Sequence, residues 1–340
     1  MKAPGFWYRQ AGWAAALLGP LGALYAAGAR HRQVGATPQP AGIPVICVGN
    51  LVAGGAGKTP LAEAVMRRLR ARGIDAQYLS RGYGGRLRGP LRVDPAQHRA
   101  ADVGDEPLLL SASAPAWISA DRLAGARAAR DGGAQAVVMD DGFQNPALAK
   151  DLSLLVVDGG AGFGNGRVIP AGPLREDLAD GLRRAHGVVI VGADRLDARR
   201  TVATLAPALP VLTARLVPDP AVAARLSGHP VLAFAGIGRP QKFFDTCLEL
   251  GLSVAERVFF PDHHPYTREE IARLLDRAAA IGATPLTTQK DWVRLPAEAQ
   301  ARVTALPVVL RFDNDGALDG LLDSVTRDRP WPTTAPCAAP

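Results

Sequence analysis

The amino-acid sequence predicts an α/β protein with two domains, each built on a largely parallel sheet covered by helices. Three observations predict it. Short runs rich in Val, Ile and Leu alternate with helix-like stretches, a pattern typical of a parallel sheet. The length of 340 residues is enough for about two domains of ordinary size. A content of 48% hydrophobic and 21% charged residues is that of a folded globular protein.

The apolar runs divide into two series. Those of the first series lie at residues 43–48, 134–140, 152–158 and 186–194. A proline-rich stretch at 207–220 separates them from a second series, which opens at 230–238 and ends with a strand-like segment at 307–312. We therefore expect a first domain over residues 33–215 and a second, smaller α/β domain over residues 216–325. Residues 1–32 are expected to form an N-terminal membrane-associated helix, and the proline-rich residues 326–340 a disordered tail.

Charge and cysteine content restrict the partners. The net charge of +7 and the pI near 9.7 favour acidic partners, which include nucleic acid, nucleotides and anionic membranes. No Lys/Arg run of five or six marks a nucleic-acid arm, so no nucleic acid is expected, and no protein partner is evident. Cys47, Cys247 and Cys337 lie far apart, which indicates a reducing compartment without a thiolate metal site.

The N-terminus contains twenty uncharged residues between Arg9 and Arg30, enough for a helix of about 30 Å. Its large apolar residues fall along one helical stripe: Phe6, Trp13, Leu17, Leu21 and Leu24. Many of the other residues are Ala and Gly, and Pro20 interrupts the middle, so a helix lying on a membrane surface fits best. A packing helix of the large domain, a membrane span and a signal peptide are the alternatives.

A glycine-rich stretch, VGNLVAGGAGKTP at residues 48–60, follows the first apolar run. Glycines 54, 55 and 57 allow backbone N–H groups to face a polyphosphate, and a helix begins after them with its positive end toward the anion. Lys58 would contact the β- and γ-phosphate oxygens, and the Thr59 hydroxyl would bind magnesium. Residues Val52, Ala53, Gly54, Gly55, Ala56, Gly57, Lys58 and Thr59 are thus the expected ATP-binding residues. Val52 occupies the place of the first glycine of the usual pattern. The first domain is accordingly predicted to be P-loop NTPase-like.

Two acidic residues end the apolar run at 134–140. Asp140 stands where a P-loop site needs a carboxylate for Mg²⁺, and Asp141 adjoins it. Adjacent carboxylates repel each other unless a cation or base lies between them, so the pair indicates metal binding or catalysis. A capped turn formed by Asp141 is the structural alternative.

Other motifs place polar residues at the ends of predicted elements. SRGYGG (80–85) puts Arg81 after a strand, where ligands bind in open α/β sheets. VGDEP (103–107) carries Asp105 and Glu106, for which the first turn of a helix is an equal alternative. In FPDHHPYTREE (260–270) a capping box from Thr267 to Glu270 leaves two histidines, 263 and 264, in the preceding loop.

Together, these motifs resemble those of the tetraacyldisaccharide 4'-kinase family, the lipid A 4'-kinases, over roughly residues 5–312. The stretches that carry the resemblance are VGNLVAGGAGKTP, SRGYGG, VGDEP, DDGFQ, GNGRVIPAGPLRE, FAGIGRPQKFF, FPDHH and TTQKDWVRL. The resemblance implies transfer of the ATP γ-phosphate to the 4'-hydroxyl of a tetraacylated glucosamine disaccharide 1-phosphate, on the cytoplasmic face of the inner membrane. It also implies two α/β/α domains joined by a short β connection. Asn145 follows DDGFQ where many relatives carry histidine, so that position is given no role.

The resemblance assigns residues to the steps of phosphoryl transfer. It implies that Asp105 is the general base, assisted by His263 from the second domain. Lys58 and Arg81 would stabilise the transition-state charge, Thr59 and Asp140 would hold Mg²⁺, and Asp141 would position the metal shell or Lys58. Weaker candidates for the acceptor site are Asn50, Glu176 and Asp291. The lipid disaccharide and an anionic membrane surface are the expected partners.

Two other functions share part of this pattern. A nucleotide-dependent switch or metallochaperone-type ATPase or GTPase would use the same loop and Asp140. It does not predict a membrane helix or an acid and a histidine placed for an alcohol. A soluble small-molecule P-loop kinase or ligase would use the N-terminal helix only for packing.

Overall fold

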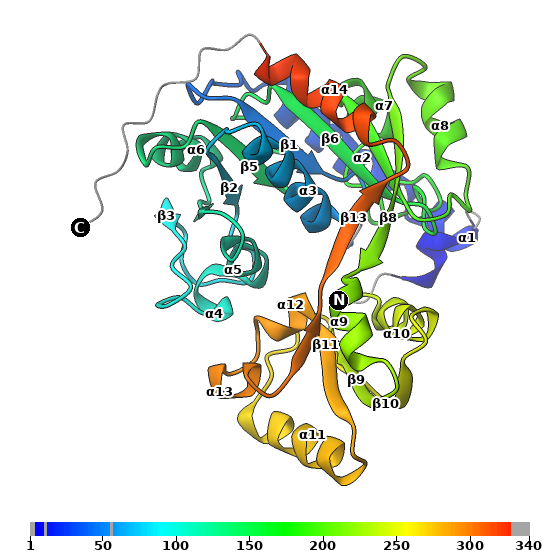
Figure 1. The fold of residues 1–340 in the computed structure, drawn as a ribbon. Helices are drawn as coiled ribbons and strands as arrows, with labels where there is room; N and C mark the ends of the chain where they lie inside the picture. Colours follow the sequence, from blue (N-terminus) through cyan, green and yellow to red (C-terminus); the bar gives the residue numbers. More distant parts are fainter. Residues whose placement is uncertain (1–3, 10–11, 55–56, 328–340) are drawn as a thin grey trace.

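The computed structural model describes residues 4–9, 12–54 and 57–327, which form two α/β domains (Figure 1). A nine-stranded sheet is the centre of the large domain, and a four-stranded sheet is the centre of the small one. Two antiparallel strands, β8 (Val211–Pro218) and β13 (Val308–Phe312), run from the large domain toward the small one (Figure 1). The predicted α/β fold with a second, smaller domain is confirmed.

The large sheet has the strand order β13-β8-β7-β6-β1-β5-β2-β4-β3, and the seven strands from β8 to β4 in this order all pair in parallel. Its other strands are β1 (Val45–Gly49), β2 (Ala76–Ser80), β3 (Leu91–Arg92), β4 (Ala116–Ile118), β5 (Ala136–Asp140), β6 (Leu152–Asp158) and β7 (Gly187–Val191). Every residue of β1, β5, β6 and β7 is buried, which explains why these strands are continuous apolar runs without alternation. Because the strands are parallel, their carboxyl ends share one edge, where the site residues follow them.

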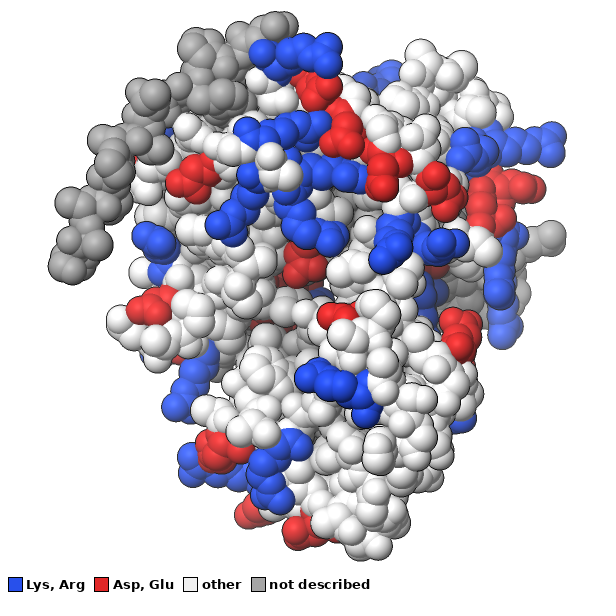
Figure 2. Space-filling view, viewed as in Figure 1, with Lys and Arg blue, Asp and Glu red and all other residues white. Residues whose placement is uncertain are grey.

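Helices cover both faces of the large sheet. On one face lie α3 (Lys58–Ala71), α4 (Ala100–Val103), α5 (Asp105–Ser111) and α14 (Asp315–Thr326). On the other lie α6 (Arg122–Asp131), α7 (Leu178–Arg183) and α8 (Ala198–Leu205). A group of basic side chains over α3 lies beside a row of acidic side chains on α14 (Figure 2), where Arg68 and Arg72 pair with Asp315, Asp319 and Asp323. These two arginines therefore join α3 to α14.

The small sheet has the order β10-β9-β11-β12, with all neighbours parallel. Its strands are β9 (Pro230–Ala235), β10 (Ser253–Phe259), β11 (Thr284–Thr288) and β12 (Thr304–Leu306). Its helices are α9 (Pro220–Leu226), α10 (Pro240–Glu249), α11 (Arg268–Ala280), α12 (Gln289–Trp292) and α13 (Ala297–Gln300). The predicted capping box is confirmed: Thr267 caps α11 and the Glu270 side chain returns to the Thr267 N–H.

The end of the second domain differs from the prediction over 216–325. After β12 the chain returns to the large domain, where β13 pairs with β8 at the edge of the nine-stranded sheet. Leu310 of β13 and Leu318 and Leu322 of α14 are buried in the large core. The segment at 307–312 therefore belongs to the large sheet, because burial of these leucines fixes it there. Most of the predicted tail lies outside the described residues.

The N-terminal segment forms three short elements: η1 (Gly5–Tyr8), α1 (Trp13–Leu17) and α2 (Gly19–Val34). Trp13, Leu17, Leu21 and Leu24 are 54–82% exposed, and we call these four residues the exposed stripe. The other side of α2 packs on the large domain, where Gly22 approaches the carbonyl oxygen of Val168. Within the described residues, no helix combines the length and apolarity that crossing a bilayer requires.

Candidate active site

The glycine-rich loop lies between β1 and α3, at the carboxyl edge of the large sheet. Gly54 has φ +118° and Gly57, the N-cap of α3, has φ +87°, a region that side-chain-bearing residues rarely adopt. Open space surrounds the position that a Gly54 side chain would occupy. Gly55 and Ala56 lie outside the described residues. The loop thus has the strand-to-helix position and the positive helix end that suit an anion.

The first half of this loop is hydrogen-bonded to the GNGRVIPAGPLRE segment, residues 164–176. Val52 forms a β-bridge with Leu174, and the Ala53 N–H donates to the carbonyl oxygen of Pro173 at 2.8 Å. The Val52 side chain is buried in the core beneath the sheet. Packing in that core explains why valine can stand where the usual pattern has glycine.

Asn50 stabilises the loop through side-chain hydrogen bonds. Its side-chain amide donates to the carbonyl oxygens of Val52 and Gly54, at 2.8 and 3.2 Å. Its side-chain oxygen accepts a bond from the Lys58 ammonium group at 3.5 Å. Since Asn50 is fully buried, its amide holds the loop and the lysine in place.

Thr59 and Asp140 meet as predicted. The Thr59 hydroxyl donates to Oδ2 of Asp140 at 3.1 Å, and both side chains are buried. Oδ1 of Asp140 is buried without a hydrogen-bond partner among the described residues. Burial and the charge of Glu106 raise the pKa of Asp140, although Lys58 opposes this. A buried carboxylate with a free oxygen is a position where a cation would be stabilised.

Asp141 lies between two cations. Its carboxylate is 3.7 Å from the Lys58 ammonium and 2.9 Å from the Arg175 guanidinium. Burial would raise the pKa of Asp141, but these two cations hold it below its ordinary value. Its backbone φ of +53° is unusual for a side-chain-bearing residue, as is the +56° of His263. Such strain is often found at functional sites, so both outliers support a role for these residues.

Arg81 follows β2 at the same sheet edge, as predicted, and its side chain is exposed. Its charge helps lower the pKa of the buried Arg122, for which burial is the larger cause. The backbone around Arg81 is tightly packed, because a side chain at Gly104 would meet the carbonyl oxygen of Tyr83 at 2.5 Å. The SRGYGG and VGDEP motifs therefore require glycine where they touch each other.

Asp105 and His263 join the two domains. Nδ1 of His263 lies 2.8 Å from Oδ2 of Asp105, at the start of α5. That hydrogen bond raises the pKa of His263 against the opposing effect of burial. Burial would raise the pKa of Asp105, but His263 and Arg294 hold it below its ordinary value. The pair that the family resemblance implies is thus assembled in this structure.

Three cations of this site were not predicted: Arg175, Lys290 and Arg294. Lys290 is 2.6 Å from Glu106, across the same domain boundary, and Nε of Arg294 is 3.4 Å from Asp105. Lys290 also interacts electrostatically with both Asp105 and Asp140, which places the pair of Asp105 and His263 near the phosphate loop. The TTQKDWVRL motif contains Lys290 and Arg294, but its spacing gives no reason to select them.

The three residues assigned to the acceptor are all buried and hydrogen-bonded within the protein. Asn50 braces the loop, and Glu176 accepts from Gln144 and Arg184. Asp291 accepts from the Gly236 N–H, from the Tyr266 and Thr288 hydroxyls and from Arg294. This differs from the expectation that they contact the acceptor. Their side-chain oxygens are already bonded inside the protein, so these residues support other residues instead.

A second interdomain contact lies at the end of β6. Arg239 and Lys242, at the start of α10, pair with the buried carboxylate of Asp158. Asp158 also accepts from the Gly160 N–H at 2.9 Å, which fixes its orientation. The FAGIGRPQKFF motif thus contributes basic groups that hold the small domain against the large one.

Comparison with known proteins agrees with these observations. A family model described as tetraacyldisaccharide-1-P 4'-kinase matches residues 14–327. A protein of Rhodospirillum centenum named tetraacyldisaccharide 4'-kinase is 62% identical over 95% of this chain and 96% of its own length. One of Rhodospirillum rubrum with the same name is 54% identical over 97% and 99%. A crystal structure of LpxK from Aquifex aeolicus in complex with ATP covers 92% of this chain and 99% of its own, with a TM-score of 0.71 and 26% identity. The chain belongs to the tetraacyldisaccharide-1-P 4'-kinase family.

Proposed function

We propose that this protein transfers the γ-phosphate of ATP to the 4'-hydroxyl of a tetraacyldisaccharide 1-phosphate, a step of lipid A biosynthesis. The observation that carries the proposal is the hydrogen bond between Asp105 and His263, formed between the two domains next to the phosphate loop. A nucleotide switch needs the loop but has no use for such a pair. An alcohol acceptor needs a group that takes its proton.

The loop would bind the triphosphate. Backbone N–H groups of residues 54–59 would face the phosphate oxygens, and the start of α3 would add its positive end. Lys58 would neutralise charge on the β- and γ-phosphates, in a position fixed by Asn50 and Asp141. Arg81 would add a second positive charge at the same edge, and Arg175 would hold Asp141.

Residues Thr59 and Asp140 fit Mg²⁺. Both offer oxygen atoms, which this cation prefers, and Oδ1 of Asp140 has no hydrogen-bond partner among the described residues. Mg²⁺ would neutralise charge on the phosphate oxygens and orient them. A bound cation would also favour the ionised form of Asp140, whose pKa burial raises.

Asp105 and His263 would accept the proton of the 4'-hydroxyl as one unit. With its Nδ1 at Asp105, His263 is held in one ring orientation, and the carboxylate stabilises the imidazolium that proton uptake creates. Arg294 supports Asp105 from the small domain. Because the pair forms across the domain boundary, separation of the domains would break it.

The exposed stripe would bring the enzyme to its lipid acceptor. Four large apolar side chains in one solvent-facing row favour burial at the interface of a bilayer. Exposed basic residues near the stripe, among them Arg32, would favour an anionic surface. We place the protein at the cytoplasmic face of the inner membrane, where ATP is present.

Product analysis tests this function. Purified protein is incubated with γ-labelled ATP, magnesium and tetraacyldisaccharide 1-phosphate in detergent micelles, and the lipid product is separated and its phosphate located. Label at the 4' position is the expected result. Release of labelled inorganic phosphate without a labelled lipid would instead support the nucleotide-dependent switch.

A further inference from the structure

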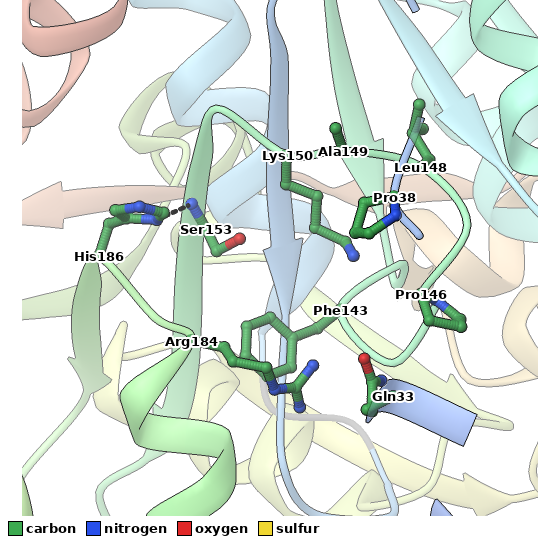
Figure 3. A pocket seen from close by; sticks show the side chains of 10 residues that line it. All are labelled: Gln33, Pro38, Phe143, Pro146, Leu148, Ala149, Lys150, Ser153, Arg184 and His186. Carbon is green, nitrogen blue, oxygen red and sulfur yellow. Dashed lines mark hydrogen bonds between the residues drawn. The ribbon is translucent and has the colours of Figure 1, made fainter. Parts of the chain in front are cut away.

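A hollow of about 170 Å³ lies beneath the turn that follows Asp140 and Asp141, on the face of the sheet opposite α3 (Figure 3). Its walls come from α2, the 143–150 segment and the residues around α7, including Gln33, Phe143, Lys150, Arg184 and His186. By the same measure, a space of about 10–15 Å³ is enough to hold one water molecule. The hollow is large enough for a small polar group.

Two basic side chains are turned toward this hollow. The Lys150 ammonium donates to the carbonyl oxygen of Asn145, and an ammonium group has three N–H bonds to donate. The Arg184 guanidinium lies 4.7 Å from the centre of the Phe143 ring and is paired with Glu176. Figure 3 shows the Arg184 guanidinium between Phe143 and Gln33, with the Lys150 side chain pointing toward them from the other end of the 143–150 segment. Both cations are therefore held in place by protein groups.

His186 also lines the hollow. Its Nδ1 accepts the backbone N–H of Ser153 at 3.0 Å, so the neutral ring carries its proton on Nε2. The positive charge of Lys150 and Arg184 is balanced only in part, by Glu176. Burial, together with the nearby charge of Arg184, lowers the pKa of Lys150, although Glu176 opposes this. An anion in the hollow would offset the cost of this buried positive charge.

Hydrogen bonds connect the hollow to the proposed reaction site. Gln144 donates from its side chain to Glu176, which pairs with Arg184, and accepts at its side-chain oxygen from Arg175 at 3.4 Å. Arg175 in turn pairs with Asp141. The hollow and the phosphate loop thus lie on opposite sides of the turn that follows Asp140 and Asp141.

The hollow is also close to the membrane-facing segment. Gln33 near the end of α2 donates to the backbone carbonyl oxygen of Gln144 at 3.0 Å. Leu24, the last residue of the exposed stripe, is nine residues earlier on the same helix, a distance of about 13 Å along its axis. A lipid beside the stripe would therefore have its phosphorylated headgroup near the hollow.

We propose that this hollow binds a phosphate monoester, the 1-phosphate of the glycolipid acceptor, through Lys150, Arg184 and His186. The inference rests on the proposed function, which supplies an acceptor with a phosphate at one end and the reacting hydroxyl at the other. Recognition of the 1-phosphate here would select a phosphorylated disaccharide over an unphosphorylated one. Lys150 would have the largest effect, since Glu176 already neutralises Arg184.

Binding without ATP tests the proposal. The dissociation constants of the tetraacyldisaccharide with and without its 1-phosphate are measured by calorimetry in detergent micelles, for the wild type, Lys150→Met and Lys150→Arg. An exposed arginine on α9 provides a matched control, Arg225→Gln, which removes one positive charge elsewhere. Thermal unfolding of each variant shows that the fold is retained.

We expect Lys150→Met to weaken binding of the phosphorylated disaccharide by about ten- to a hundredfold, the scale of one hydrogen bond to a charged group. The unphosphorylated disaccharide should bind the wild type and this variant equally, and Lys150→Arg and Arg225→Gln should stay within about threefold of the wild type. An equal loss for both disaccharides, or no loss for either, would overturn the proposal. Complete displacement of the acceptor by equimolar phosphatidic acid would overturn its assignment to the acceptor's phosphate. Because no turnover is needed, these results remain readable even if the wild type forms no 4'-phosphorylated product, which would contradict the proposed function instead.

Discussion

The pair of Asp105 and His263 allows a double-variant test of the chemistry. The two side chains meet at 2.8 Å, Asp105 is buried, and the bond crosses the domain boundary. A general base contributes about 10²- to 10⁴-fold to a rate, which corresponds to roughly 2.7–5.4 kcal/mol at about 1.36 kcal/mol per tenfold. Asp105→Ala and His263→Ala should therefore each lower kcat/KM by at least about a hundredfold.

The double variant decides whether the pair acts as a unit. If Asp105 and His263 handle one proton together, removing both should cost at most about threefold more than the worse single change. The assay is steady-state transfer to the phosphorylated disaccharide, with nucleotide affinity and thermal unfolding measured for each variant. His264→Gln is the matched control, because the neighbouring His264 pairs with Glu270 and should retain turnover within about threefold.

A double loss equal to the product of the two single losses would show that the residues act independently. Near-normal turnover of Asp105→Ala would remove this residue from the mechanism altogether. Loss of nucleotide binding in the single variants would indicate that they disturb the loop, which the separate affinity measurement detects.

Three further predictions concern the loop, the pH dependence and the membrane. Lys58→Ala should lower turnover by at least about a hundredfold, because its charge would face the transferred group in the proposed mechanism; steady-state kinetics showing a normal rate would contradict this. Since His263 must be neutral to take a proton and Asp105 raises its pKa, activity should be lost as pH falls through a value above 6.5. In Asp105→Asn the acid limb of the pH profile of kcat/KM should move to lower pH, with a smaller maximum rate. If this limb does not move, it does not report the titration of His263. Serine at all four positions of the exposed stripe should abolish liposome flotation while leaving thermal unfolding unchanged, and continued flotation would show that the stripe is not the membrane contact.

Local patterns were sufficient to predict where most residues of the proposed site lie in the fold. Lys58, Thr59 and Asp140 each adjoin a strand or helix end that the sequence marks with glycine or with a buried apolar run. Parallel strands bring such ends to one edge, so Thr59 and Asp140 meet although 81 positions separate them. The contact of Asp105 with His263 was implied by the family resemblance, because nothing in the local sequence relates the two domains.

The remaining features depend on long-range packing. The segment at 307–312 has the apolar character of a strand in either sheet, and only its pairing with β8 and the burial of Leu310 decide between them. The polar residues Asn50, Glu176 and Asp291 look available in the sequence. Because these side chains are buried, they need hydrogen-bond partners inside the protein. They bond to Lys58, Arg184 and Arg294, respectively, and so support those residues.

A crystal structure with a nonhydrolysable ATP analogue and the phosphorylated disaccharide tests the central claim most directly. The account predicts the triphosphate in the loop at residues 52–59, its terminal phosphate beside Lys58, and the 4'-hydroxyl within hydrogen-bond distance of the Asp105 and His263 pair. A triphosphate bound elsewhere, or a 4'-hydroxyl remote from both side chains in the closed protein, would contradict it.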